Sequence, residues 1–406
     1  MSELTSRERV RMALRHEEPD KVPIDFGAMR STGINAMAYN ELKKYLNIDT
    51  PTKVYDIFQQ LAEPEEKILN ILGADVVQLH RLRPSFGIDN LSWKEAKLQD
   101  GSEALVPSGL NPVINEHGDQ DIIVDGNVIA RMPKDGFYYD YMHRPYKDAK
   151  TMDDIDKVLI EEISDEEIEY LKVQAKKLYE ETDRAILGNF GGSVFEQGQV
   201  EWGYEKYYLE MALNPDLVRY YLDKKVDAYM RDLKKYLAAV GEYIDVINFS
   251  DDLGTQENSQ ISREMYKNIF KPYHAKMFQY VRENYPHVKV FIHSCGAILD
   301  MIPELIDAGL EVLNPVQISA RNMDPAHLKK EFGKHLSFWG AGVSTQTTLS
   351  FGTIEEIKQE VKDLTEIFAP GGGFVFSQIH NIQAKVSPEK VMAVYDTINS
   401  IRDYKK

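Results

Sequence analysis

The chain has 406 residues, a hydrophobic fraction of 43% and a formal net charge of −17. This length suits one large α/β barrel with additions, and the negative charge argues against nucleic acid or an anionic membrane as a partner. A single cysteine excludes an internal disulfide framework, and no apolar stretch approaches the length of a membrane span. Because the charged N-terminus also lacks the apolar core of a signal peptide, we expect a cytoplasmic protein.

Short apolar segments, which predict buried strands, alternate along the chain with amphipathic segments, which predict helices. Residues 5–16 are expected to form an N-terminal helical extension capped by Ser6. Eight strands are expected at residues 22–27, 75–80, 184–192, 243–252, 290–293, 312–317, 336–343 and 373–380. Eight strands alternating with helices predict a parallel sheet closed into a (β/α)8 TIM barrel, with a doubly wound open sheet as the alternative.

Residues 91–146 interrupt this alternation of strands and helices. Their polarity changes residue by residue and Asp125-Gly126 is a hairpin turn signal, so we expect a β-rich insertion within one domain spanning 1–406. Aromatic side chains near the mouth of a barrel serve either core packing or the wall of a pocket. The aromatic residues open to both interpretations are Phe137–Tyr141, Phe195 and Trp202.

Polar side chains gather at the predicted C-terminal ends of the strands, where the active sites of (β/α) barrels lie. The residues expected there to bind substrate are His80, Asn189, Gln317 and Gln378. Asp251 and Asp252 follow the fourth strand, and because they are adjacent only one of them faces inward. The inward one could orient a metal ligand, act as a general base or serve as a fourth ligand, whereas capping a helix is the competing interpretation. Two further histidines, His274 and His287, are predicted to lie on the surface.

His293 and Cys295 stand two residues apart at the end of the fifth strand, so their side chains project to the same side. From this spacing alone, half of a zinc site and a buried histidine beside a small hydrophobe are equally good interpretations. Together with His380 at the end of the eighth strand, the two residues would form a nitrogen, nitrogen and sulfur donor set. Three protein donors with an open fourth position are typical of catalytic zinc sites.

Several motifs, in the same order, resemble the uroporphyrinogen decarboxylase superfamily. The segments that carry the resemblance are Arg7–Pro23, His293-Ser-Cys-Gly296, Leu313-Asn-Pro-Val-Gln317, Phe338-Trp-Gly-Ala-Gly342, and His380 followed by Ser387-Pro-Glu389. The resemblance runs nearly from end to end and implies a (β/α)8 barrel.

Within that superfamily, decarboxylases carry an Arg-Gln-Ala-Gly-Arg-Tyr signature after the first strand, of which only Arg30 is in place here. One arginine is a poor clamp for the carboxylates of a tetrapyrrole. The zinc-dependent methyltransferases, typified by methylcobamide:coenzyme M methyltransferases, carry His-x-Cys on strand five and a second cysteine on strand eight. His293 and Cys295 match the first pair, whereas His380 stands where the second cysteine would be and where decarboxylases carry a histidine. The missing thiol would make the metal a stronger Lewis acid.

The insertion resembles that of the first-step methyltransferases of O-demethylase systems. The resemblance therefore implies a Zn2+-dependent methyl transfer between a small methylated substrate, a methoxylated aromatic compound, and the cobalt of a corrinoid. The chain lacks the Asp-x-His-x-x-Gly signature of cobalamin binding, so the corrinoid is expected on a separate partner protein. The alternatives are decarboxylation of uroporphyrinogen and a non-catalytic, metabolite-binding barrel, neither of which needs a metal.

Overall fold

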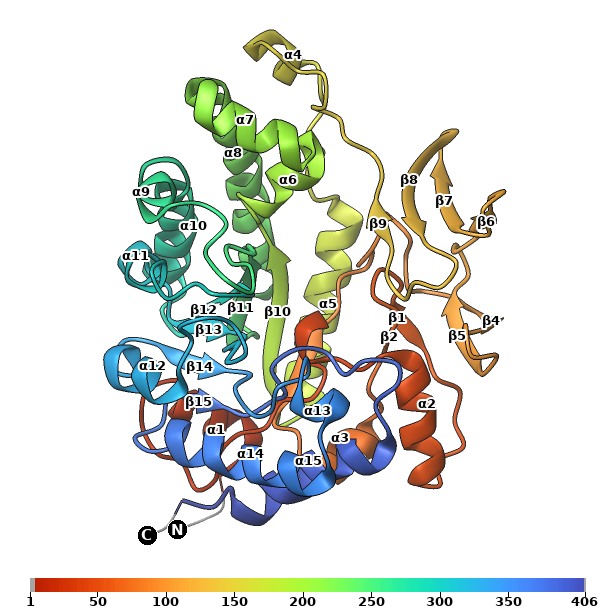
Figure 1. Ribbon diagram of the computed structural model, residues 1–406, viewed down its shortest axis with the longest axis vertical. Coiled ribbons are helices and arrows are strands. Elements are labelled where there is room, and N and C mark those ends of the chain that lie inside the picture. Colours follow the sequence, from red (N-terminus) through yellow and green to blue (C-terminus); the bar gives the residue numbers. More distant parts are fainter. Residues whose placement is uncertain (1–3, 405–406) are drawn as a thin grey trace.

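A seven-stranded parallel sheet forms the centre of the computed structural model, which describes residues 4–404 (Figure 1). The strands lie in the order β15-β14-β13-β12-β11-β10-β3, so each strand pairs with its successor along the sheet. Their bounds are β3 (Val76–Leu79), β10 (Ala185–Gly191), β11 (Val246–Ser250), β12 (Lys289–His293), β13 (Val312–Asn314), β14 (Ser337–Trp339) and β15 (Phe374–Val375). The sheet curls on itself with helices outside, which confirms the predicted α/β barrel rather than an open sheet.

Residues 22–27, expected as the first strand, close the barrel through single backbone contacts instead of a regular ladder. The N–H of Phe376 donates to the carbonyl of Pro23 at 2.8 Å, and the N–H of Asp75 donates to the carbonyl of Ile24 at 2.6 Å. A proline has no N–H to donate, which prevents a continuous ladder at this point. The segment nevertheless joins the end of β15 to the start of β3, so seven of the eight expected strands are regular.

Side chains that point into the barrel form two layers. The lower layer is an apolar cluster that includes Val76, Leu187, Val246, Phe291, Val312, Trp339 and Val375. Residues two positions further along each strand share the same interior, because side chains alternate between the two faces. On five neighbouring strands these residues are polar, and we call them the polar layer: Gln78, Asn189, Asn248, His293 and Asn314. The apolar layer therefore fills the barrel, and the polar layer meets its C-terminal rim.

Helices cover the outer side of the sheet (Figure 1). Their bounds are α1 (Ser6–Ala13), α2 (Ala36–Tyr45), α3 (Glu66–Leu72), α4 (Met152–Asp156), α5 (Asp165–Glu181), α6 (Glu196–Trp202), α7 (Tyr204–Leu213), α8 (Pro215–Val240), α9 (Arg263–Met265), α10 (Lys271–Asn284), α11 (Ile302–Ala308), α12 (Pro325–Phe332), α13 (Thr348–Phe351), α14 (Ile354–Phe368) and α15 (Pro388–Ile401). The predicted N-cap of α1 was wrong by one residue. Thr5 accepts the N–H of Glu8 at 3.2 Å and caps the helix, whereas the hydroxyl of Ser6 donates to Asp75 at 2.6 Å.

A π-helical turn, η2 (Tyr266–Phe270), separates α9 from α10 just before Pro272. Proline lacks the N–H that continues an α-helical ladder, so the backbone ahead of it departs from regular geometry.

The expectation that His274 lies on the surface was wrong. Its side chain is fully buried, with Nδ1 2.9 Å from the Tyr266 hydroxyl and its ring stacked on Phe278. His274 lies on the same face of α10 as the buried residues Met277, Phe278 and Val281, which follow it by three, four and seven residues, so helical periodicity would have placed it inward.

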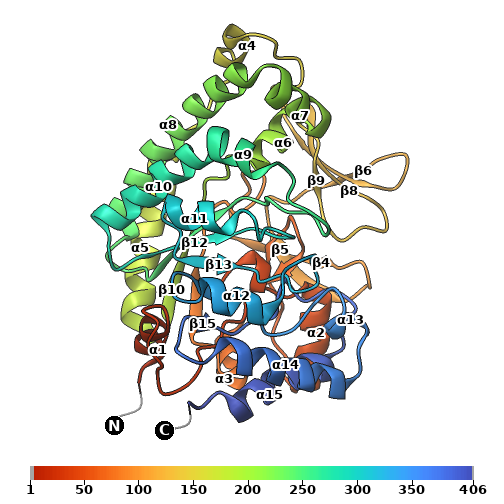
Figure 2. The same ribbon diagram turned by 60° about the vertical axis from the view of Figure 1, so that its left-hand side comes forward.

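Antiparallel strands fill the region between β3 and α4 and project from one side of the barrel (Figure 2). They are β4 (Trp93–Lys97), β5 (Glu103–Pro107), β6 (Val113–Ile114), β7 (Gln120–Val124), β8 (Asn127–Met132) and β9 (Asp140–Tyr141), and a short pair, β1 (Val54–Asp56) and β2 (Leu61–Ala62), precedes them. Asp125 and Gly126 have φ angles of 49° and 78° and join β7 to β8, as expected for a tight hairpin turn. Among residues 4–404, no helix combines the length and the apolar character that crossing a bilayer requires.

Candidate metal and substrate site

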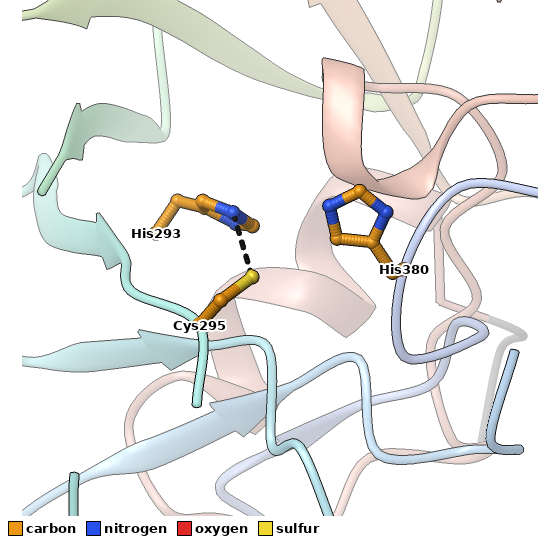
Figure 3. Close-up of side chains that lie close together, drawn as sticks. All are labelled: His293, Cys295 and His380. Carbon is orange, nitrogen blue, oxygen red and sulfur yellow. Dashed lines mark hydrogen bonds between the residues drawn. The ribbon is translucent and has the colours of Figure 1, made fainter. Parts of the chain in front are cut away.

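His293, Cys295 and His380 converge at the C-terminal rim of the barrel (Figure 3). His293 ends β12, Cys295 follows two residues later, and His380 lies beyond β15. One potential ligand atom from each residue lies within 4.8 Å of the other two, and Sγ of Cys295 is 3.3 Å from Nε2 of His293. Two imidazole nitrogens and a sulfur are donors that zinc prefers, so these side chains fit a zinc ion with an open coordination position.

Neighbouring amides fix which imidazole nitrogen faces this donor set. Nδ1 of His293 lies 2.7 Å from Oδ1 of Asn314, while Nδ2 of Asn314 donates to the carbonyl of Trp339 at 3.0 Å. The amide oxygen of Asn314 must therefore accept, so Nδ1 of His293 carries the proton and Nε2 carries the free lone pair. Nδ1 of His380 lies 3.1 Å from Oδ1 of Asn381 in the same way. His293 is thus held in the tautomer that a metal ligand needs, and His380 has an amide partner on its other ring nitrogen.

Burial controls the protonation of the same three side chains. Burial and the neighbouring His293 lower the pKa of His380 to about 4, so its imidazole is neutral near pH 7. Burial, together with the carboxyl groups of Asp252 and Glu196, raises the pKa of the Cys295 thiol. A thiol that coordinates a divalent cation loses its proton. The positive charge of the cation would offset the negative charge of the thiolate, which burial and the two carboxyl groups otherwise disfavour.

The two adjacent aspartates turn to opposite sides. Oδ1 of Asp252 accepts the N–H of Cys295 at 2.8 Å and lies 3.7 Å from Nε2 of His293, so Asp252 is the inward residue. Asp251 points away from the cavity, is completely buried and accepts the N–H groups of Phe195 at 2.9 Å and Glu196 at 2.7 Å. It therefore caps the start of α6, a helix from an earlier part of the chain. Of the two aspartates predicted as catalytic, Asp252 therefore faces the site and Asp251 does not.

A cavity of about 360 Å³ opens beside the triad and is lined by His293 and His380. We call it the axial cavity, because the polar-layer residues Gln78, Asn189 and Asn248 also line it. The structure thus places Asn189 where a substrate-binding residue was predicted.

Two other residues predicted to bind substrate lie outside the axial cavity. β3 ends at Leu79, so His80 leaves the strand and packs edge-on against the ring of Tyr55, with the centroids 4.8 Å apart. The side chain of Gln378 is fully buried, donates to the carbonyl of Thr32 at 2.7 Å and accepts the Tyr395 hydroxyl at 2.6 Å. Gln378 therefore holds the barrel closure together instead of facing a ligand.

Gln317, the fourth predicted substrate residue, lines a second cavity of about 770 Å³. Its Oε1 accepts the N–H of Gly296 at 2.8 Å, and its Nε2 donates to Oε1 of Gln256 at 2.8 Å. Cys295 and His380 line this cavity too. His380 therefore belongs to both cavities.

Several residues of the axial cavity were not singled out from the sequence, among them Tyr55, Gln78, Glu196 and Asn248. Gln78 and Asn248 could have been found, because each interrupts an apolar strand at the position that alternation directs inward. Glu196 had no such signal, since it reaches the cavity only when α6 folds over the end of β11. There, burial and the nearby Asp252 raise the pKa of Glu196 to about 8.

The aromatic residues divide between core and cavity. Phe195 and Trp202 are 0% and 1% exposed and belong to the hydrophobic core, so they form no pocket wall. The ring of Tyr141 lies 5.2 Å from that of Phe58, which lines the axial cavity, and Tyr138 lines the second cavity. Residues 138–141, at and just before β9, therefore bring aromatic side chains of the insertion to the cavities.

Comparison with known proteins agrees with this architecture. A family model described as uroporphyrinogen decarboxylase (URO-D) matches residues 137–401, a range that contains all three residues of the triad. No curated protein matches the sequence. Among solved structures, the chain is similar to a methyltransferase from Methanosarcina mazei, with 18% identity, a TM-score of 0.60, and coverage of 98% of this chain and 99% of that chain. At this identity the similarity establishes the shared fold.

Proposed function

The chain belongs to the uroporphyrinogen decarboxylase (URO-D) family, and from this premise we propose that it is a zinc-dependent methyltransferase. The methyl donor is a small methylated molecule, a methoxylated aromatic compound, and the acceptor is the reduced cobalt of a corrinoid carried by a separate protein. The observation that supports this proposal most is the convergence of His293, Cys295 and His380 within 4.8 Å at the rim. The similarity in fold to a solved methyltransferase adds support.

His293, Cys295 and His380 would hold the zinc ion. Bound there, zinc would supply Lewis-acid stabilisation of the negative charge that grows on an ether oxygen as its bond to the methyl carbon breaks. Asn314 keeps His293 in the required tautomer, and Asp252 holds the backbone of Cys295 through its N–H. These contacts fix the donors in place before a substrate arrives.

Glu196 is the proposed source of a proton. It lines the axial cavity, and because burial and Asp252 raise its pKa to about 8, it holds its proton near pH 7. An alkoxide or phenolate leaving group is a poor one unless it is stabilised, and a neutral carboxyl group nearby can protonate it. The carboxyl group of Glu196 would thus complete the departure of the oxygen.

The two cavities suit a reaction with two substrates. The methyl donor would occupy the axial cavity, and the acceptor would approach from the side of the second cavity, where Cys295 and His380 are also accessible. Transfer between two molecules requires both to reach one reacting carbon in a fixed geometry.

Decarboxylation of a tetrapyrrole is less well supported, because its several carboxylates require unpaired cations. Three arginines line the axial cavity, and each already has a carboxylate partner in the described part of the chain. The pairs are Arg30 with Asp56, Arg81 with Glu167 and Arg83 with Glu166.

Two measurements test the proposal. Elemental analysis of the purified protein is expected to find about one zinc per chain. The zinc-loaded protein, mixed with its native reduced corrinoid protein and a panel of methoxylated aromatic compounds, is expected to form methylcobalt, which is followed by absorbance. Intact protein without metal, which is expected of a decarboxylase or of a non-catalytic binding barrel, would contradict the proposal. So would an unchanged corrinoid spectrum with every donor.

A further inference from the structure

His380 lies in a loop, so its position in the triad depends on side-chain contacts. His293 ends β12 and Cys295 follows it closely, whereas His380 lies in the irregular segment beyond β15. Figure 3 shows one ring nitrogen of His380 facing His293, and Nδ1 lies 3.1 Å from Oδ1 of Asn381, the next residue of the chain. Groups behind the ligands of a metal orient those ligands, so the Asn381 amide is the natural support of His380.

The side chain of Asn381 is completely buried and is held from two sides. Its Nδ2 donates to Oε1 of Gln59, a residue of the axial cavity, at 2.7 Å. Its Oδ1 accepts from the hydroxyl of Tyr138 at 3.0 Å and from Nε2 of Gln383 at 2.5 Å, and both of these residues line the second cavity. Tyr138 belongs to the β-rich insertion and precedes Asn381 by 243 positions. The support of His380 is therefore held by a residue from a distant part of the chain.

The same contacts fix which end of the Asn381 amide faces His380. Nε2 of Gln383 lies 3.3 Å from the backbone carbonyl of Asn381, and a carbonyl only accepts, so this end of the Gln383 amide is the nitrogen. That nitrogen also donates to the Tyr138 hydroxyl at 2.8 Å and to the side chain of Asn381, which must present its oxygen. The Tyr138 hydroxyl then has its own proton left for the same oxygen. Nδ1 of His380 faces this oxygen and carries a proton, which leaves on Nε2 the lone pair that a metal binds.

Other contacts anchor the insertion to the rim without the Tyr138 hydroxyl. The N–H of Tyr139 donates to the carbonyl of Phe58 at 2.9 Å. The rings of Tyr139 and Tyr141 lie 5.6 and 5.5 Å from that of Phe86. Loss of one hydroxyl would thus leave the insertion in place, and its effect would fall on the Asn381 amide.

We propose that Tyr138 is a positioning residue of the metal site. Its hydroxyl, together with Gln383, holds the Asn381 amide so that His380 presents Nε2 to the zinc ion. The β-rich insertion thus takes part in building the metal site, although His293, Cys295 and His380 all lie outside it. This inference rests on the proposed zinc site and adds the residue that supports its third ligand.

Competition for zinc with a chromophoric chelator tests the role of the hydroxyl. Tyr138→Phe removes this group alone and is expected to weaken zinc binding roughly threefold to tenfold, less than the loss of a direct partner of a ligand, because Tyr138 acts through Asn381. Tyr139→Phe is the matched control. Its hydroxyl donates to Oε1 of Gln120 at 3.1 Å within the insertion, so this variant should bind zinc as tightly as the unaltered protein.

Variants of Asn381 test the connection between Tyr138 and the metal ligand. Asn381→Leu removes the acceptor and is expected to weaken zinc binding roughly 10- to 100-fold. Asn381→Asp keeps an acceptor for His380 and for Tyr138 and should bind zinc nearly as tightly as the unaltered protein. Adding Tyr138→Phe to Asn381→Leu should have no further effect, since the hydroxyl acts through an amide that is already lost. Tyr138→Phe and Asn381→Asp change the shape of the side chain little, so they decide the question even where Asn381→Leu fails to fold.

Cobalt(II) in place of zinc reports the coordination of the metal. Its visible absorption is strong in a tetrahedral site and weakens when the coordination number rises, and a separate band arises from its bond to a thiolate. Tyr138→Phe is expected to alter the first absorption and to keep the band of Cys295. The midpoint of urea unfolding of zinc-free Tyr138→Phe should lie close to that of Tyr139→Phe, because each variant loses one hydroxyl. A merely structural role would shift this midpoint and leave the cobalt spectrum of the folded protein unchanged.

The possible results separate this inference from the proposed function. Unchanged zinc affinity and an unchanged cobalt spectrum in Tyr138→Phe would overturn the positioning role. An equal loss of affinity in Tyr139→Phe would overturn it too, because the effect would then come from a loosened insertion. So would a loss in Asn381→Asp as large as that in Asn381→Leu. These outcomes leave the metal site in place, whereas an unaltered protein that binds no zinc would contradict the proposed function itself, and this inference with it.

Discussion

Replacing Asp251 by alanine is expected to destabilise the fold and to spare the metal site, although its neighbour Asp252 lies beside the triad. Asp251 is completely buried and accepts the hydroxyl of Ser193 at 2.7 Å and the N–H groups of Phe195 and Glu196 at 2.9 and 2.7 Å. These N–H groups belong to the first turn of α6, where no helical carbonyl is available to accept them. Alanine would leave them buried and unpaired.

The expected loss follows from these contacts. A hydrogen bond to a charged group contributes about 1.5–3 kcal/mol, and loss of an N-cap costs about 0.5–2 kcal/mol. The bonds share one acceptor and are therefore not additive, so Asp251→Ala is expected to lower the free energy of unfolding by about 4 kcal/mol. Asp252 is 34% exposed and accepts one N–H, so Asp252→Ala is expected to cost about 1 kcal/mol.

Urea denaturation of the zinc-free protein, followed by tryptophan fluorescence, measures the first effect. Competition for zinc with a chromophoric chelator measures the second. Asp251→Ala should unfold at a clearly lower urea concentration and, below its transition, bind zinc as tightly as the unaltered protein. Asp252→Ala should unfold near the unaltered protein and bind zinc roughly tenfold more weakly, as expected when a residue that supports a ligand is removed.

Equal unfolding midpoints for the two variants would refute the capping role of Asp251. A stable Asp251→Ala protein that no longer binds zinc would show that the carboxylate acts at the metal, contrary to the geometry.

Three further predictions concern the triad, its support and pH. His293→Ala is expected to contain no zinc in elemental analysis. The control His287→Ala alters an exposed histidine and should retain the zinc. Zinc retained in His293→Ala would show that His293 is not a zinc ligand. Asn314→Leu removes the acceptor of His293 Nδ1 and is expected to weaken zinc binding about 10- to 100-fold in chelator competition, and unchanged affinity would refute the orienting role. Burial raises the pKa of the Asp25 carboxyl group from 3.8 to about 6. The native state therefore binds the carboxyl proton more tightly than the unfolded state does. As a result, the contribution of Asp25 to stability falls as the pH rises from about 4 to about 6. The difference in urea midpoint between Asp25→Asn and the unaltered protein should therefore vary between pH 4 and pH 7, and a constant difference would contradict the raised pKa.

The positions of the strands and of two metal-ligand candidates could be predicted from local patterns alone. Apolar segments located seven regular strands within a few residues, because a strand buried on both faces has to be apolar over its whole length. The two-residue period placed His293 and Cys295 on one side for the same geometric reason. Alternation from Asn248 through Ser250 would also have identified Asp252 as the inward aspartate.

Other residues depended on where elements end and what folds over them. His80 has the same parity as Gln78, yet β3 ends between them and only Gln78 reaches the cavity. Gln378 was predicted to face a ligand, but Tyr395 of the last helix binds its amide from outside the strand.

The sequence by itself therefore determined the barrel, the strand faces and the residue types at the rim, since these follow from chain-local alternation and burial. Only the tertiary structure decided that His380 reaches His293 and Cys295, that Asp251 caps a distant helix, and that Asn189 and Asn248 bind each other across β10 and β11. Each of these depends on contacts between residues tens of positions apart, whose distance and orientation are set when the sheet closes and the helices pack around it.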